Sequence, residues 1–378
     1  MSKRPPSSAP VIPGLSYLRP LGSGGFADVF LYEQDLPRRT VAVKVLLADA
    51  IAPEVRRRFV QEADLMARLS THPSILSIYQ ASIASDGRPY LVTEFCPDSM
   101  AAEYRRRQLP VGLVLDAGVR LASALETAHR AGVLHRDIKP SNILITSLGT
   151  PVLADFGIAT VLSGPRDGAA ELDDDELVAM SIPWSSPEVL DERTTGTVAS
   201  EVWSLGATLH TLLNGRSPFA EPDRARNERD LIVARIRKAN PKPIERDDVP
   251  PPVRDVLART MRFDPAQRQA SMLELAEELR WAQVQLGLSP TSLEVAGEAW
   301  GAAAPPVGSP DAPRGPVLST VQTESRRAAR AAAALRSDEE PVTTSSSSRR
   351  GLLIGLLIGA GVLIAAAIAV VVVVIGAG

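Results

Sequence analysis

The stretch from His135 to Gly157, HRDIKPSNILITSLGTPVLADFG, carries side chains of the types needed to bind a cation beside a phosphate. Two short apolar runs within it, ILI and PVLA, read as strands joined by a turn. A hairpin of this size would hold Asp137, Asn142 and Asp155 near one point. Carboxylate and amide oxygens so placed can hold a hard cation, and a further carboxylate can orient a hydroxyl for attack on a phosphate.

These residues resemble the catalytic loop and metal-binding motif of protein kinases, H-R-D-x-K-P-x-N followed by D-F-G. The motif K-P-S-N is similar to the corresponding motif of serine/threonine kinases. The resemblance implies that Asp137 orients the substrate hydroxyl and accepts its proton, while Lys139 offsets charge on the γ-phosphate of ATP. Asn142 and Asp155 would hold Mg²⁺, with Mn²⁺ as the alternative metal. A buried hairpin that carries these residues by chance is disfavoured, because type, order and spacing all agree.

A glycine-rich turn, G-S-G-G-F-A-D-V at 22–29, lies between two predicted strands upstream. Glycine lets backbone N–H groups approach phosphate oxygens without a Cβ in the way. A plain hairpin is the simpler reading of the turn alone, but V-A-V-K at 41–44 follows and matches the V-A-I-K strand of kinases. Ala27 replaces the third glycine of the family motif, which we expect to affect affinity or loop mobility rather than binding itself.

The resemblance assigns the nucleotide site. Lys44 would reach the α- and β-phosphates, held by Glu62 on an amphipathic helix over 54–69, although a solvated helix face is the other reading of Glu62. Thr93 would lie at the back of the adenine pocket and 94–96 would form the hinge. Because no motif supplies a base to activate its thiol, Cys96 is expected to be a passive hinge residue rather than a nucleophile. The implied ATP-binding residues are Leu21, Gly22, Ser23, Gly24, Gly25, Val29, Ala42, Lys44, Thr93, Glu94 and Cys96.

The segment after D-F-G is expected to order the substrate side of the site. In many kinases a phosphothreonine in this loop pairs with the H-R-D arginine, here Arg136. No hydroxyl residue lies mid-loop, so the acidic run 173–176 is one candidate for that role, and a solvated charge run is the other reading. Ser181 matches the Ser/Thr that touches the catalytic aspartate.

Other residues of the resemblance are structural. Glu188 in S-P-E corresponds to the A-P-E motif and should pair with Arg268. Glu201 stands where the family has an aspartate that holds the catalytic-loop backbone, and its extra methylene leaves that geometry open. Phe156 is expected to pack in the core against Met66.

Composition narrows the classes of protein and of site. The chain has 378 residues and a net charge of −3, so no global basic field favours nucleic acid as a partner. A single cysteine excludes an intramolecular disulfide and a cysteine-rich zinc site. No charged-then-apolar signal peptide opens the chain.

Four regions follow from these patterns. Residues 1–13 are expected to be a disordered tail. The resemblance implies that residues 14–287 form an α+β protein kinase domain of two lobes, a small β-rich N-lobe and a helical C-lobe. Residues 288–350, rich in Ala, Pro, Ser and Arg, read as a disordered juxtamembrane linker. Residues 351–375 read as a single transmembrane helix.

The C-terminal stretch 351–378 has no charged or polar side chain and is long enough to cross ~30 Å of hydrocarbon. Arg349 and Arg350 place its N-terminal side in the cytoplasm, with the C-terminus at the far side of the cell membrane and no extracellular domain expected. Glycines 351, 355 and 359 repeat every four residues. This face (Gly351, Gly355 and Gly359) could pack against another helix, so a homodimer could form through it or through the kinase domain.

The sequence thus predicts a membrane-anchored serine/threonine protein kinase that acts on protein hydroxyls and on itself, with Thr160, Ser163 and 343–348 as candidate autophosphorylation sites. Its partners would be protein substrates and the lipid bilayer. A catalytically silent membrane-anchored scaffold is the competing class, favoured by Ala27 and Glu201 and opposed by the intact catalytic residues. Phosphotransfer to small molecules on the same fold is a further alternative.

Overall fold

The computed structural model describes residues 4–24, 27–47, 59, 63, 66–156 and 181–296. The chain divides into two compact units, Met1–Pro306 and Val307–Gly378, and every described residue belongs to the first. Within the described part, no helix has both the length and the apolarity required to cross a membrane. The predicted membrane helix, and the predicted linker from 297 onward, lie outside the described residues.

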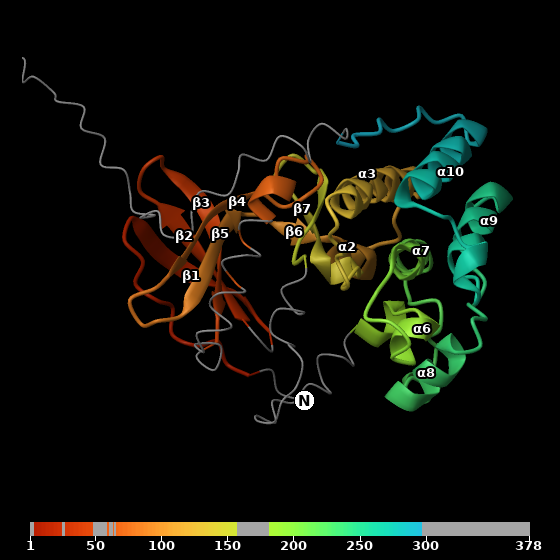
Figure 1. The fold of residues 1–378 in the computed structure, drawn as a ribbon, viewed down its shortest axis with the longest axis horizontal. Helices are drawn as coiled ribbons and strands as arrows, with labels where there is room; N and C mark the ends of the chain where they lie inside the picture. The colour runs from red at the N-terminus through yellow and green to blue at the C-terminus, as the bar shows by residue number, and fades with distance from the viewer. Residues whose placement is uncertain are drawn as a thin grey trace, which may run out of the picture. The chain divides into compact units, whose positions relative to one another are not determined.

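The N-terminal lobe is built on a sheet that is five-stranded among the described residues, with the antiparallel order β1-β2-β3-β5-β4 (Figure 1). Alternating apolar residues and intervening turns favour these strands, since successive side chains point to opposite faces. Buried apolar residues occupy both sets of positions in these strands, with Val43 and Tyr90 in a cluster on one face and Leu46 and Leu91 in a cluster on the other, so both faces of the sheet are apolar. Its strands are β1 (Leu15–Ser23), β2 (Ala27–Gln34), β3 (Arg39–Leu46), β4 (Ile78–Ile83) and β5 (Pro89–Glu94).

One face of the sheet packs against the helix predicted over 54–69. Its described residues 59, 63 and 66–69 are helical. Phe59 and Ala63, one turn apart, are buried with Leu46 and Leu91. This packing places the helix on the same face as Lys44, two residues before Leu46 on β3.

The other face of the sheet is covered by the N-terminal segment. Ile12 is 3% exposed and joins a buried cluster with Phe30, Tyr32 and Val43. The Tyr32 hydroxyl donates to the Pro10 carbonyl at 2.6 Å. Composition predicts a disordered tail over 1–13, and the structure differs from that prediction over residues 4–13.

Two buried charged side chains hold the start of this segment. Asp28, fully buried on β2, accepts from Arg4 Nη2 at 2.5 Å and from the Ser7 backbone N–H at 2.8 Å. Arg88, 6% exposed, donates to Ser7 Oγ at 2.9 Å and to the Ser8 carbonyl at 2.7 Å. The segment is ordered because these groups satisfy its backbone and because Ile12 fills the sheet face.

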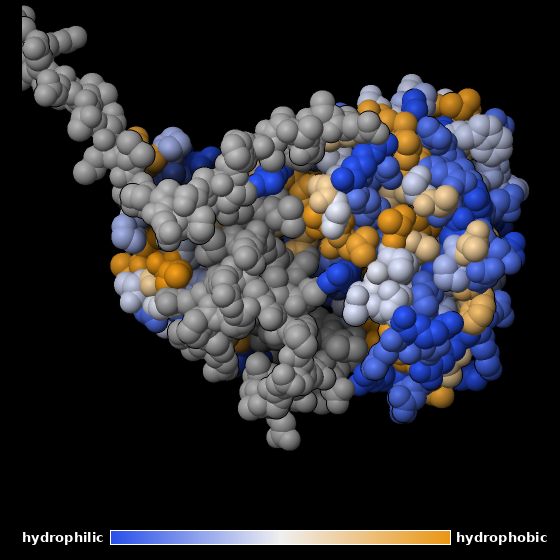
Figure 2. All heavy atoms as spheres, viewed as in Figure 1, coloured by the Kyte–Doolittle hydropathy of each residue, from blue (hydrophilic) through white to orange (hydrophobic). Residues whose placement is uncertain are grey.

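The C-terminal lobe is mainly helical, with apolar faces turned inward and hydrophilic side chains over α8 and α9 (Figure 2). A small sheet, in the order β6-β7-β8, carries the stretch that contains Asn142 and Asp155. The elements are β6 (Asp98–Ser99), α2 (Met100–Arg106), α3 (Val111–Arg130), β7 (Ile143–Ile145), β8 (Pro151–Leu153), α6 (Pro187–Leu190), α7 (Val198–Asn214), α8 (Arg229–Ile236), α9 (Pro251–Thr260) and α10 (Met272–Gln285).

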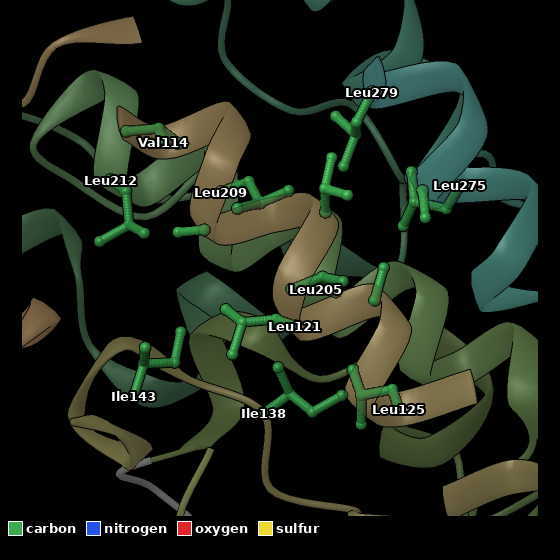
Figure 3. Packing of buried hydrophobic residues seen from close by; sticks show 14 of the residues in the cluster. Val114, Leu121, Leu125, Ile138, Ile143, Leu205, Leu209, Leu212, Leu275 and Leu279 are labelled. Carbon is green, nitrogen blue, oxygen red and sulfur yellow. The ribbon is translucent and has the colours of Figure 1, made fainter. Parts of the chain in front are cut away.

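The core of this lobe lies where α3, α7 and α10 meet (Figure 3). Leu121 of α3, Leu209 of α7 and Leu279 of α10 are each at most 1% exposed. Gly206 lets α7 approach α9, because a Cβ there would lie 1.8 Å from Thr260 Oγ1. Any larger residue at 206 would force the two helices apart.

The structure changes some element boundaries. The apolar residues over 75–83 favour a strand across that whole range, but β4 begins at Ile78. The preceding residues pair with β8 instead, since Leu76 N donates to Leu153 O at 3.0 Å and Leu153 N donates to Ser74 O at 2.9 Å. Strand β6 and helix α2 were not predicted. Both are shorter than the windows in which periodicity can be read.

We expect Ile12→Ala to lower the free energy of unfolding by about 2–5 kcal/mol, because it empties a buried site that the sheet cannot easily refill. The measurement is urea unfolding of the full chain. Val11→Ala, at a side chain that is 81% exposed, is the matched control and should change little. Equal stability of the two variants would contradict the packing of this segment.

Candidate active site

The β7–β8 hairpin fixes the two ends of the catalytic stretch. Ile143 pairs with Leu153, and Ala154 N donates to Asn142 O at 2.8 Å. The His135 ring, fully buried, contacts the Phe156 ring at 4.5 Å and lies 2.9 Å from the Ala154 carbonyl. Burial lowers the pKa of His135, so the neutral ring can donate through Nε2 and accept the Asp137 N–H at Nδ1, 3.2 Å away.

Asp137 lies at the centre of a polar network. Its Oδ1 accepts from Ser181 Oγ at 2.6 Å. Its Oδ2 accepts from Asn142 Nδ2 and is paired with Lys139 Nζ, both at 2.8 Å. Lys139 Nζ also donates to Ser181 Oγ at 2.9 Å. The structure therefore brings together the residues predicted to handle the substrate hydroxyl and the γ-phosphate.

Lys44 of β3 reaches across to the hairpin. Its Nζ lies 2.7 Å from Asp155 Oδ1, while Glu62, predicted as its partner, lies outside the described residues. Burial alone would raise the pKa of the Asp155 carboxyl, but the Lys44 ammonium holds this pKa below its ordinary value. Asp155 is thus an ionised carboxylate, and its side chain keeps 42% exposure.

Two residues of the site have left-handed backbone, Arg136 with φ 66° and Asp155 with φ 63°. For residues other than glycine this conformation costs about 1–3 kcal/mol each and persists only where the surroundings impose it. At Arg136 the constraint comes from Glu201 Oε1, which accepts the Arg136 N–H at 2.6 Å. The longer side chain of Glu201 therefore reaches the catalytic-loop backbone, the point that sequence left open.

Glu201 has a second partner that sequence reasoning missed. Its Oε2 lies 2.6 Å from His129 Nε2 at the end of α3, and both side chains are almost fully buried. The sequence favours an amphipathic helix over 111–131 with His129 on the same face as Leu121 and Leu125, and this pattern by itself names no partner for the His129 ring. A polar residue at such a position, six residues before His135, was the available signal for a buried hydrogen bond.

The residues predicted for nucleotide binding share one face of the sheet. Lys44 pairs in register with Val29 and Leu91, and Ala42 pairs with Thr93. Because paired residues of antiparallel strands point to the same side, Val29, Ala42, Lys44 and Thr93 lie on the face that Lys44 turns toward Asp155. This is the arrangement that a nucleotide with its phosphates near Lys44 requires.

The glycine turn connects β1 to β2. Leu21, Gly22 and Ser23 end β1, and Gly22 pairs with Val29. Gly24 N donates to the Ala27 carbonyl at 2.9 Å, which closes the turn despite the missing third glycine. Gly25 lies outside the described residues.

The predicted hinge follows β5. Thr93, 8% exposed, donates from Oγ1 to the Glu94 carbonyl at 3.2 Å, and Glu94 N donates to Ser77 O at 3.0 Å. Burial raises the pKa of the Cys96 thiol to about 12, which agrees with the expectation of a passive cysteine. Cys96 packs in one cluster with Leu144 of β7, an apolar neighbour that sequence reasoning did not place there.

Glu188 and Arg268 lie in contact, 80 residues apart in the chain. Arg268 Nη1 and Nη2 donate to the two carboxylate oxygens of Glu188 at 2.6 and 3.0 Å. Burial would raise the pKa of Glu188, but the Arg268 guanidinium holds it below its ordinary value. Arg268 also stacks on the Trp203 ring at 4.9 Å, so the pair braces α6 against α7.

Asn142 and Asp155 are the candidate metal ligands. Asn142 Nδ2 donates to both the backbone and the side chain of Asp137, so its Oδ1, which accepts a long bond of 3.4 Å from Ser141 Oγ, is the oxygen that could bind a cation. Among the described residues no group of three or more His, Cys, Asp or Glu side chains could hold a metal ion. Mg²⁺ in nucleotide enzymes commonly takes one or two protein ligands plus water and phosphate oxygens, so an oxygen pair of this kind fits it.

Several predicted residues cannot be placed. Glu62, Gly157, the acidic run 173–176, and the hydroxyls of Thr160 and Ser163 all lie outside the described part of the chain. Arg136, the predicted partner of the loop, has an exposed side chain.

Comparison with known proteins supplies the wider context. The protein kinase domain family matches residues 15–279. The serine/threonine-protein kinase PknK of Mycobacterium tuberculosis is 37% identical over 281 residues, which cover 73% of this chain and 24% of that protein. The serine/threonine-protein kinase PrkC of Bacillus subtilis is 32% identical over 271 residues, which cover 70% of this chain and 40% of that protein. The match thus spans about a quarter of PknK and less than half of PrkC.

A solved structure is also similar. The crystal structure of the kinase domain of Mycobacterium tuberculosis PknI superposes with a TM-score of 0.53 at 27% sequence identity. The superposition covers 72% of this chain and 97% of that domain.

We expect Glu188→Gln to lower the free energy of unfolding by about 3–5 kcal/mol, because it leaves the buried Arg268 charge without its partner. Thermal and urea unfolding of the full chain would measure the change. Glu277→Gln, at an exposed position on α10, should be close to wild type. If both variants unfold alike, the ion pair does not brace this lobe.

Proposed function

This chain belongs to the protein kinase family, and from that premise we propose that it transfers the γ-phosphoryl group of ATP to serine or threonine hydroxyls of proteins. The observation that carries the proposal is the polar network around Asp137, with Lys139, Asn142 and Ser181 all in contact with its carboxylate. The relatives PknK and PrkC are both named serine/threonine-protein kinases. This supports hydroxyl groups of proteins as the acceptors.

Asp137 is the residue that meets the acceptor. The Ser181 hydroxyl already donates to its Oδ1 at 2.6 Å, so a serine hydroxyl can reach this oxygen with good geometry. A substrate hydroxyl in an equivalent position would be oriented toward the phosphate and would pass its proton to Asp137. The Lys139 ammonium lies 2.8 Å from Oδ2 and would offset negative charge on the transferred phosphoryl group.

Lys44 and Asp155 serve the phosphates from the other side. Lys44 would bind α- and β-phosphate oxygens as a fixed positive charge, and Asn142 and Asp155 would hold Mg²⁺. Held there, Mg²⁺ would supply positive charge that offsets the negative charge developing on the phosphate oxygens. Positioning and charge then supply most of the rate, since phosphoryl transfer asks for little covalent chemistry from the protein.

The test is phosphate transfer from labelled ATP to a generic basic protein, with full-length chain in detergent and Mg²⁺. Asp137→Asn should reduce kcat by about 10²–10⁴-fold, because it removes the acceptor of the proton. Lys44→Met should also abolish most transfer. Asp230→Asn, an exposed aspartate on α8, is the matched control and should retain activity.

Phosphorylated residues would be identified by mass spectrometry, which also reports autophosphorylation. ATP binding without transfer in the wild-type chain would contradict the proposal and favour a silent scaffold. Transfer that survives Asp137→Asn would contradict the role of that carboxylate.

We further propose that residues 351–375 cross the cell membrane and hold the kinase domain at its cytoplasmic face. The support is the uninterrupted apolar sequence and the two arginines before it. Tethering would raise the local concentration of protein substrates at the bilayer and of a second copy of the chain, which favours autophosphorylation in trans.

The membrane proposal predicts that the full chain sediments with membranes and resists extraction by high salt or carbonate. A chain without 351–378 should move to the soluble fraction, because the apolar segment is the only proposed anchor. Soluble full-length protein would contradict the proposal.

A further inference from the structure

The chain does not leave the C-terminal lobe where its last helix ends. Composition places the start of the linker at 288, yet residues 288–296 run from α10 across α3, in cyan in Figure 1. A Cβ on Gly112 at the start of α3 would lie 3.2 Å from Leu288, and Leu293 packs on the core cluster. We call residues 288–296 the C-terminal strap.

Thr291 anchors the strap to α10 and α3. Its side chain is buried, and Oγ1 donates to Asp116 Oδ1 at 2.8 Å. The buried Gln283 side chain engages Thr291 twice, donating to Oγ1 at 2.8 Å and accepting the Thr291 N–H at 2.9 Å. A buried threonine whose hydroxyl and backbone N–H are both hydrogen-bonded is a fixed point rather than part of a loose linker.

The far end of the strap contacts a loop that belongs to the other lobe. Ala296 N donates to Thr127 Oγ1 on α3 at 3.3 Å. The Glu294 carbonyl lies 2.5 Å from His72 Nε2, and His72 Nδ1 accepts the Ser74 N–H at 3.0 Å. Burial lowers the pKa of His72, and the neutral ring can donate from one nitrogen while it accepts at the other.

From His72 the contacts continue to the active site. Ser74 O accepts the Leu153 N–H at 2.9 Å, and Leu153 is the last residue of β8, two residues before Asp155. On the other side, His72 N donates to Leu69 O at 3.0 Å, at the end of the helix that packs on the sheet. Loop 70–76 is thus held between that helix, β8 and the strap.

We propose that Thr291 and His72 are positioning residues, and that the strap they anchor holds loop 70–76 against β8 and thereby fixes Asp155. The inference rests on the proposed function, in which Asp155 is a metal ligand. A strap that only covered apolar surface would need no hydrogen bond to His72. The contact places the end of the catalytic unit at residue 296 or beyond, rather than at 287.

The test uses paired variants of the full-length chain. Thr291→Val keeps the volume and loses the hydroxyl, and Thr291→Ser is its conservative control. His72→Asn keeps an acceptor for the Ser74 N–H and is too short to reach Glu294, whereas His72→Gln keeps a donor at the reach of Nε2.

The first readout is amide hydrogen exchange in peptides that cover 72–76 and 151–155, which does not depend on catalysis. We expect Thr291→Val and His72→Asn to speed exchange by about 2–10-fold, the effect of one neutral hydrogen bond. The double variant should match either single variant, because the strap is released once. Thr291→Ser should resemble the wild type in both peptides, and His72→Gln should resemble it in 151–155, because it keeps the bond to the strap but loses the acceptor of the Ser74 N–H.

The second readout is the Mg²⁺ concentration for half-maximal transfer at saturating ATP, which should rise in Thr291→Val and His72→Asn and stay low in the conservative variants. Unchanged exchange in 151–155, or a drop in melting temperature with no change in the Mg²⁺ requirement, would overturn the inference. If the wild type shows no transfer while exchange responds as expected, the proposed function fails and the fixing of β8 by the strap is supported.

Discussion

The buried carboxylate of Glu201 is the constraint on which the catalytic loop depends. It accepts the N–H of Arg136, whose backbone is left-handed, and it is held in turn by His129 on α3. A buried carboxylate without hydrogen-bond partners would cost free energy, so the position of Glu201 on α7 requires both of its partners. Glu201 thereby fixes the catalytic loop to the helical core, and the contacts of His135 and Asn142 with Ala154 fix it to the end of β8.

The ion pair between Lys44 and Asp155 joins the sheet to this framework. Lys44, placed by the register of β3 between β2 and β5, reaches Asp155 beyond β8. The ammonium keeps the carboxylate ionised, and the partial exposure of Asp155 leaves it accessible to a cation. When nucleotide and metal bind, Lys44 would contact phosphate oxygens and Asp155 would contact the metal, in place of their contact with each other. Because the two residues are far apart in the chain, they meet only once the two lobes have folded together.

Both ends of the described chain extend the catalytic unit beyond what composition indicates. Residues 4–12 are polar and rich in proline, and 288–296 show no apolar period, so neither has the local pattern of a packed element. Their order comes from buried polar groups elsewhere, above all Asp28 and Arg88 for the first and Gln283 and His72 for the second. A prediction from the composition of a segment alone cannot take account of hydrogen-bond partners that lie dozens or hundreds of residues away.

The sequence by itself determined the motifs, their order and the chemistry they favour, because Asp137, Lys139 and Asn142 act within a few residues of one another and the strands around them have a period of two. It also determined that alternate residues of one strand, such as Ala42 and Lys44, share a face, whereas the pairing between strands came from the structure. Only the tertiary structure decided that Glu201 reaches Arg136, that His129 supports it, that Lys44 meets Asp155, and that the strap contacts His72. These contacts join residues that are 65–222 positions apart in the chain. Local sequence patterns do not say which of such distant residues meet, because tertiary packing sets the distances between them.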